Sequence, residues 1–163
     1  LVDNKYGYTE IFVPDVEVND GEIISLGNTS IEFKSTPGHT LGAMSLFFEI
    51  TEGENVYRCG MLGGGGFVTM SNDFLLKYNI PFTIREDFLN SLNRLENEKV
   101  DITLGNHPFH NDTWEKYDKL IKSDRKENPF INSKEWKEFI NYTKKEFLDF
   151  LKAEENKSKN NLK

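Results

Sequence analysis

The stretch from residue 22 to residue 61 contains an alternating apolar–polar segment followed by two apolar runs, and this pattern constrains the fold more than any other feature of the sequence. Within it, Ile31 and Phe33 fall on one face of an extended segment, while Glu32 and Lys34 fall on the other. A period of two residues is the signature of a β-strand with one buried face. We therefore expect the first third of the chain to form a sheet.

Two hairpins explain the rest of this stretch. The first is expected to turn at Gly27-Asn28, because such pairs tolerate the backbone conformation of tight hairpin turns. The second is expected to turn within "TEGEN" and to join two apolar runs. The four expected strands are residues 22–26, 29–35, 44–50 and 55–61. A further short strand is expected in "EIFVP" at residues 10–14.

The later part of the chain changes to helical spacing. Ser71 is expected to N-cap a short helix over residues 72–78. Capping-box patterns, Thr83 with Glu86 and Asp112 with Glu115, predict two more helices. The first of these carries an apolar stripe, Ile84, Phe88, Leu92 and Leu95. A long amphipathic helix is expected from residue 133, and "VDITLG" is expected to form a short buried strand between helices.

Strands followed by helices, with one late strand among the helices, predict helices packed on a mixed sheet. The fold class is therefore α/β, with α+β as the alternative. At 163 residues the chain is long enough for one domain with its own core. We assign residues 1–152 to this domain and expect the charged stretch 153–163 to be a disordered tail.

The charge and the cysteine content limit the partners. With 20 Lys and Arg against 27 Asp and Glu, the net charge is −7, which disfavours binding to nucleic acid through phosphates. Nothing in the sequence suggests a membrane span. The single cysteine, Cys59, excludes an intrachain disulfide and does not fix the compartment, for which the cytoplasm is the first expectation. We expect a soluble protein that acts on a small-molecule substrate.

Three histidines are the candidates for chemistry. His39 lies in "STPGHTLGAMS", where flanking glycines allow a turn to present an imidazole at the end of a strand. His107 and His110 follow the late strand in "LGNHPFHND", where sites form in α/β proteins. Each could equally be a solvated turn histidine. Two histidines could form part of a zinc site, but catalytic zinc usually takes three protein ligands.

Two other features have a structural and a functional interpretation. Cys59 lies in an apolar strand, so a buried core cysteine is expected ahead of a thiolate ligand. The run Gly63–Gly66 is not a phosphate-binding loop, because no Lys-Ser or Lys-Thr follows it. We expect a flexible loop there, close to a site.

The segment "STPGHTLGAMSLFFEI" resembles the "TPGHTxGxxS" segment of the metallo-β-lactamase superfamily. The hairpin before it, "VNDGEIISLGNTSIEFKST", and the later "VDITLGNHPFHND" resemble the corresponding parts of that family, in the same order. The resemblance covers residues 20–122 and is to the third subclass and related uncharacterised hydrolases. Glyoxalase II-like members have a second histidine where this chain has Ala43.

The resemblance implies a fold, a cofactor and a reaction. The chain would be the C-terminal half of an αββα sandwich, a mixed sheet with helices on one face. His39 would bind a first zinc ion and His107 a second, whereas His110 would line the pocket or orient a ligand. The family's zinc-bound hydroxide would attack an ester, thioester, amide or lactam in the intact parent.

This chain departs from the family pattern in two ways. The family's "HxHxDH" motif, which precedes the "TPGHT" segment, has no counterpart before His39. No Asp or Glu occurs from Asn55 through Asn72, where many members place an acidic ligand, although Cys59 could substitute. We therefore expect weak zinc binding and no activity from the isolated chain, and pairing with the missing N-terminal half or a second copy. The alternative is a non-catalytic fragment or interaction module.

Overall fold

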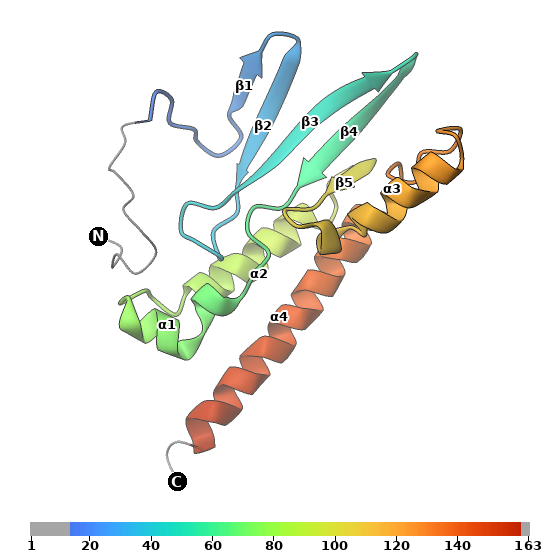
Figure 1. Ribbon diagram of the computed structural model, residues 1–163. Coiled ribbons are helices and arrows are strands. Elements are labelled where there is room, and N and C mark those ends of the chain that lie inside the picture. Colours follow the sequence, from blue (N-terminus) through green and yellow to red (C-terminus); the bar gives the residue numbers. More distant parts are fainter. Residues whose placement is uncertain (1–13, 161–163) are drawn as a thin grey trace.

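The computed structural model describes residues 14–160, and Figure 1 shows their arrangement as one sheet with helices packed beneath it. The strand expected at residues 10–14 falls on residues that lie outside this range, apart from the last one. Within it, no helix is both long and apolar enough to cross a membrane.

Five strands form a mixed sheet in the order β1-β2-β3-β4-β5. The first four are antiparallel neighbours, and β5 pairs parallel with β4. Their bounds are β1 Ile23–Leu26, β2 Thr29–Ser35, β3 Met44–Glu52, β4 Asn55–Met61 and β5 Ile102–Leu104. This confirms the α/β class with a mixed sheet, and Gly27 turns the first hairpin with a φ of 63° as its position predicts.

The helices come after β4 and after β5 in the sequence and lie to one side of the sheet (Figure 1). Their bounds, with two 3₁₀ turns, are η1 Val68–Met70, α1 Asn72–Lys77, α2 Ile84–Leu95, η2 Pro108–His110, α3 Thr113–Lys122 and α4 Glu135–Asn160. The predicted stripe of α2 is buried throughout. Helices α2 and α4 therefore cover the sheet face that holds the core.

The core forms where the start of α4 packs against the sheet. The ring of Trp136 lies edge-on to that of Phe47 at 5.4 Å, and its indole nitrogen donates to Leu95 O at 2.8 Å. Gly60 makes this approach possible, because a Cβ there would lie 2.9 Å from Val100 Cγ2 and 3.2 Å from Trp136 Cζ3. A larger residue at Gly60 would force the side chains of Val100 and Trp136 to shift.

The opposite face of the sheet is also apolar, although no helix covers it in Figure 1. The strand register places Phe48 beside Ile31 and Cys59, and Leu46 beside Phe33. We call this the outer face; its members on β2, β3 and β4 are Ile31, Phe33, Leu46, Phe48, Ile50, Cys59 and Met61. Cys59 is buried and Ile50 is exposed, whereas the other five are half-buried within the structure.

The helix starts differ in part from the predicted caps. The Ser71 hydroxyl accepts from Phe74 N at 3.3 Å, so this predicted N-cap is confirmed. Thr83 and Asp112 precede α2 and α3 as predicted, but neither side chain makes a capping hydrogen bond. Asp112 has a left-handed backbone, with a φ of 51°, whereas an N-cap residue that makes the capping hydrogen bond typically has an extended one.

The predicted disorder from residue 153 onward is wrong for residues 153–160, which continue α4. Tertiary contacts explain the difference. Glu154 is 3% exposed, and its carboxylate accepts from Asn72 N at 2.6 Å and from Lys157 Nζ at 2.7 Å. Burial opposes ionisation of Glu154, yet Lys157 and the Asn72 amide hold its pKa below the usual value. The end of α4 is thus anchored to the start of α1.

Candidate functional site

His39 lies in the loop that leaves β2, and close packing fixes this loop. Thr36 N donates to Ala43 O at 2.9 Å across its base, and the buried hydroxyls of Thr36 and Ser45 lie 3.0 Å apart. At its turn, a Cβ on Gly38 would lie 2.2 Å from Phe88 Cδ2. Glycine is therefore required where the loop meets α2, and it sets the position of His39.

The run Gly63–Gly66 passes directly against this loop. A Cβ on Gly63 would lie 2.1 Å from Met44 O, and one on Gly64, whose φ is 71°, would lie 2.5 Å from His39 Cβ. Glycines at these two positions let the chain leave β4 beside the imidazole. The run predicted to lie close to a site does lie beside His39.

The hydrogen bonds of His39 fix its tautomer. Its Nδ1 lies 2.9 Å from Gly66 O, and because a carbonyl can only accept, Nδ1 carries the proton. In the neutral ring Nε2 is then unprotonated, which is the form that binds a metal. A backbone carbonyl on the other ring nitrogen is a common support for histidine ligands. The Thr69 hydroxyl holds the backbone of the same residue by donating to His39 O at 2.7 Å.

His107 and His110 lie in the loop between β5 and α3. His107 is exposed, and its ring stacks on that of Phe109 with centroids 5.2 Å apart. His110 is half-buried and meets His107 edge-on at 5.2 Å. Burial, and secondarily the charge of His107, lowers the pKa of His110. Asn106 joins this loop to the end of β4 by donating to Leu62 O at 2.9 Å.

The two histidine loops meet at Gly65 and Gly66. A Cβ on Gly66 would lie 3.5 Å from His39 Cε1, and one on Gly65 would lie 3.9 Å from His110 Cε1. His39 and His110 therefore flank the same two glycines, and His107 lies beside His110, with ring centroids 5.2 Å apart. Asn106, which holds the second loop against this run, gave no signal in the sequence beyond its position next to His107.

The residues gathered here do not complete a metal site. Among residues 14–160, no three His, Cys, Asp or Glu side chains lie together in a way that could hold a metal ion. Cys59 is 2% exposed in β4, and burial, followed by the charge of Asp101, raises the pKa of its thiol. It is a buried core cysteine, as expected. A zinc ion bound by His39 or His107 would need further ligands.

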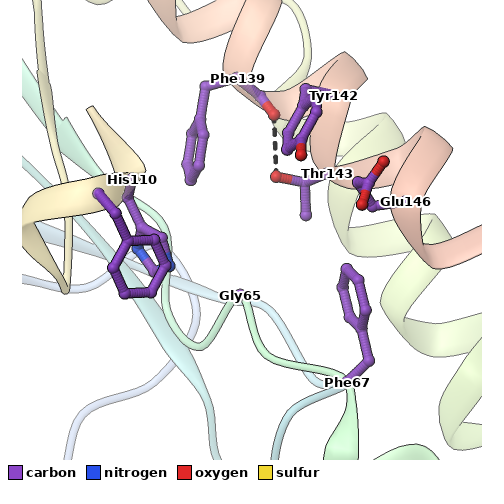
Figure 2. A pocket seen from close by; sticks show the side chains of 8 residues that line it. Gly65, Phe67, His110, Phe139, Tyr142, Thr143 and Glu146 are labelled. Atoms are coloured by element: carbon purple, nitrogen blue, oxygen red, sulfur yellow. Dashed lines mark hydrogen bonds between the residues drawn. The ribbon is translucent and has the colours of Figure 1, made fainter. Parts of the chain in front are cut away.

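A pocket opens beside the histidines, between their loops and α4 (Figure 2). Its volume is about 250 Å³. Figure 2 shows Phe139, Tyr142 and Glu146 of α4 on one side, His110 opposite them, and Gly65 between. The pocket therefore adjoins both histidine loops through Gly65 and His110.

Comparison with solved structures shows that the fold of this chain is that of metallo-β-lactamases. No protein-family model matches the chain, and neither does any curated protein sequence. Among solved structures, the chain is similar to BJP-1, a subclass B3 metallo-β-lactamase of Bradyrhizobium japonicum, with a TM-score of 0.81 and 22% identity. That match covers 94% of this chain and 56% of the other.

Two further structures agree. A mutant of the FEZ-1 metallo-β-lactamase from Legionella gormanii has a TM-score of 0.80 and 27% identity, covering 94% of this chain and 57% of that one. A metallo-β-lactamase variant from Cronobacter sakazakii has a TM-score of 0.71 and 26% identity, covering 87% and 53%. The chain thus spans a little over half the length of these structures, and it belongs to the metallo-β-lactamase superfamily with a subclass B3-like fold.

Proposed function

We propose that this chain contributes His39 and His107 to the zinc site of a metallo-hydrolase whose other ligands lie outside the described residues. The observation that carries the proposal is the hydrogen bond from His39 Nδ1 to Gly66 O, which leaves Nε2 available. The proximity of the His107 loop to the same glycine run supports it. The similar solved structures are named as metallo-β-lactamases, which favours this chemistry.

The proposed reaction is hydrolysis of an ester, thioester, amide or lactam. Zinc in such a site acts as a Lewis acid that polarises a carbonyl oxygen and acidifies water. The residues of this chain hold His39 in one tautomer through Gly66 O, and they shape the pocket beside His110 that would receive part of the substrate.

We further propose that the outer face packs against a complementary half of the domain. The chain spans about 56% of the BJP-1 structure, so a substantial part of that domain has no counterpart here. An apolar sheet face that remains half-exposed favours association with another apolar surface. A second copy of this chain is the alternative partner, and ultracentrifugation of the chain alone separates the two.

Titration with zinc tests the ligand assignment. We expect the full chain to bind zinc weakly in competition with a chromophoric chelator. His39→Ala and His107→Ala should each lower the affinity by about tenfold or more, because a direct ligand is removed. His110→Ala is the comparison variant and should lower the affinity less than either of these, since His110 contacts His107 but is not assigned as a ligand.

The second candidate function is a non-catalytic interaction module, and the incomplete ligand set among the described residues favours it. It predicts that zinc affinity does not respond to either His39→Ala or His107→Ala. Under that result the outer face would be the functional surface of the chain, and the hydrolase proposal would be abandoned.

A further inference from the structure

The pocket of Figure 2 is lined by aromatic side chains and by a few polar ones. Its apolar lining comes from three separate parts of the chain, with Phe67 after β4, Phe109 in η2, and Phe139 and Tyr142 on α4. Aromatic rings gathered this way favour a planar apolar group, which they contact face-on or edge-on. The pocket volume of about 250 Å³ exceeds the roughly 150 Å³ of a cavity that holds benzene. One ring with a short side chain fits this space.

Two polar side chains of the pocket, Glu146 and Thr143, present acceptors, and the Tyr142 hydroxyl can accept as well as donate. Glu146 is exposed at its rim, and the structure shows no ion pair for it within residues 14–160. The Thr143 hydroxyl donates to Phe139 O at 2.9 Å, so its oxygen can only accept from a ligand. None of the lining side chains is a lysine or an arginine. A ligand group that donates hydrogen bonds and carries a positive charge complements this arrangement.

We propose that this pocket binds an aromatic ring carrying a protonated amine, as the side group of the substrate cleaved at the neighbouring histidines. The ring would lie among Phe67, Phe139 and Tyr142, and the ammonium would pair with Glu146. Tyr142, which is 62% exposed, also offers its ring face to a cation. The net charge of −7 attracts a cationic ligand at longer range.

The position of the pocket connects it to the reaction centre. Gly65 lines it, and the next residue, Gly66, accepts the hydrogen bond of His39. His110 lines it as well, and its ring contacts that of His107. The assignment as a substrate side-group site rests on the proposed function, whereas the preference for an aromatic cation rests on the pocket alone.

The test uses 2-phenylethylammonium as the probe, with 2-phenylethanol and phenylacetate as the neutral and anionic counterparts. Each is titrated into the full chain in the presence of a chelator, and binding is followed through amide shifts in ¹H–¹⁵N spectra. We expect the shifts to gather around Gly65, Thr143 and Glu146. The ammonium should bind about threefold to fivefold more tightly than the alcohol, as for an exposed ion pair.

Two variants locate the charge and the ring. Glu146→Gln should equalise the affinities for the ammonium and the alcohol, whereas Glu138→Gln, an exposed position on the same helix that does not line the pocket, should preserve the difference. Gly65→Ala should weaken all three probes, since its new Cβ would have ordinary contacts 3.9 Å from His110 Cε1 and Leu62 Cδ2 and take up pocket space.

Equal affinities for the three probes in the unaltered chain, or shifts located away from this pocket, would overturn the proposal. The probe titration contains no zinc and changes no histidine. Its result is therefore independent of whether His39 and His107 bind zinc. Likewise, a negative probe titration does not affect the interpretation of the zinc titration.

Discussion

Phe47 and Phe48 are neighbours on β3 and point to opposite faces of the sheet. Phe47 is 1% exposed; the ring of Trp136 lies edge-on to it, and the Arg58 guanidinium lies 4.6 Å from its ring centroid. Phe48 is half-buried on the outer face, in register with Ile31 and Cys59. Two identical side chains at adjacent positions thus differ in burial: protein atoms surround Phe47, whereas part of Phe48 remains exposed to solvent.

This difference separates what the chain stabilises by itself from what it offers to a partner. The helix-covered face has a continuous core that runs from Phe47 through Leu92 and Trp136 to Phe147. The outer face has comparable apolar residues and keeps part of their surface exposed. A sheet buried on both faces is apolar on both, so the outer face has the composition of an interface.

Removing the inner ring should have the largest effect. Phe47→Ala is expected to lower the free energy of unfolding by about 3–5 kcal/mol, because it leaves a cavity under Trp136 and removes the ring beneath Arg58. Urea denaturation followed by tryptophan fluorescence measures this change. Phe48→Ala is the matched control and should cost less than half as much.

Equal losses for the two variants would contradict the comparison, because they would mean that the outer face is as well packed as the inner one in this chain.

The polar border of the helix-covered face should give an intermediate effect. Glu98 accepts from Arg58 Nη1 at 2.7 Å and from Lys34 Nζ, which joins the segment after α2 to the sheet. Burial opposes the ionisation of Glu98, yet Lys34 and Arg58 hold its pKa below the usual 4.5. Glu98→Gln is expected to cost about 1–2 kcal/mol at neutral pH.

The sign of the pH dependence follows from this lowered pKa. A carboxylate whose folded-state pKa lies below its unfolded-state value adds stability above the unfolded-state pKa, and this stability is lost as the pH falls through the folded-state pKa. The stability difference between the unaltered chain and Glu98→Gln should therefore be constant near pH 7 and shrink below about pH 4.5. A difference that stays constant into that acid range would show that Glu98 acts through packing rather than charge.

A charge on the outer face should have the smallest effect on stability. Phe48→Lys is expected to change the free energy of unfolding by less than about 1 kcal/mol, since lysine can keep its ammonium in water above a half-exposed position. It should also reduce binding of a dye that reports exposed apolar surface, and weaken association with a complementary half or a second copy. Dye fluorescence and sedimentation velocity measure these changes.

Unchanged association, together with unchanged stability, would show that the outer face is not the interface. Thr51→Lys, at an exposed position of β3 on the other face, is the control because it adds the same single charge.

The sequence predicted most of the local elements, and the reason lies in their periodicity. The alternation around Ile31 and the stripe at Phe88 depend on neighbours within one or two turns, so they could be read before any contact was known. The capping boxes, which are local patterns as well, were less informative. Thr83 and Asp112 have the residue types of a capping box without its hydrogen bonds, and Asp112 adopts a left-handed backbone.

The candidate site shows the same division. The sequence identified His39 and His107 by their loops and by a family resemblance, and it identified the run of four glycines as a feature near a site. It did not show that Gly66 O fixes the tautomer of His39, or that Gly65 lies between the histidines and a pocket on α4. These contacts join residues 27 or more positions apart, and only packing of the loops against each other creates them.

By itself, therefore, the sequence determined the strands, the helices and the histidines that can carry chemistry, because each depends on local pattern. The tertiary structure decided which face of the sheet is covered by helices, which glycines lie beside the histidines and where α4 ends. Glu154 illustrates the reason: its stretch has a disordered composition, yet burial against Asn72 keeps it helical. Contacts between distant segments supplied the free energy that local propensity lacked.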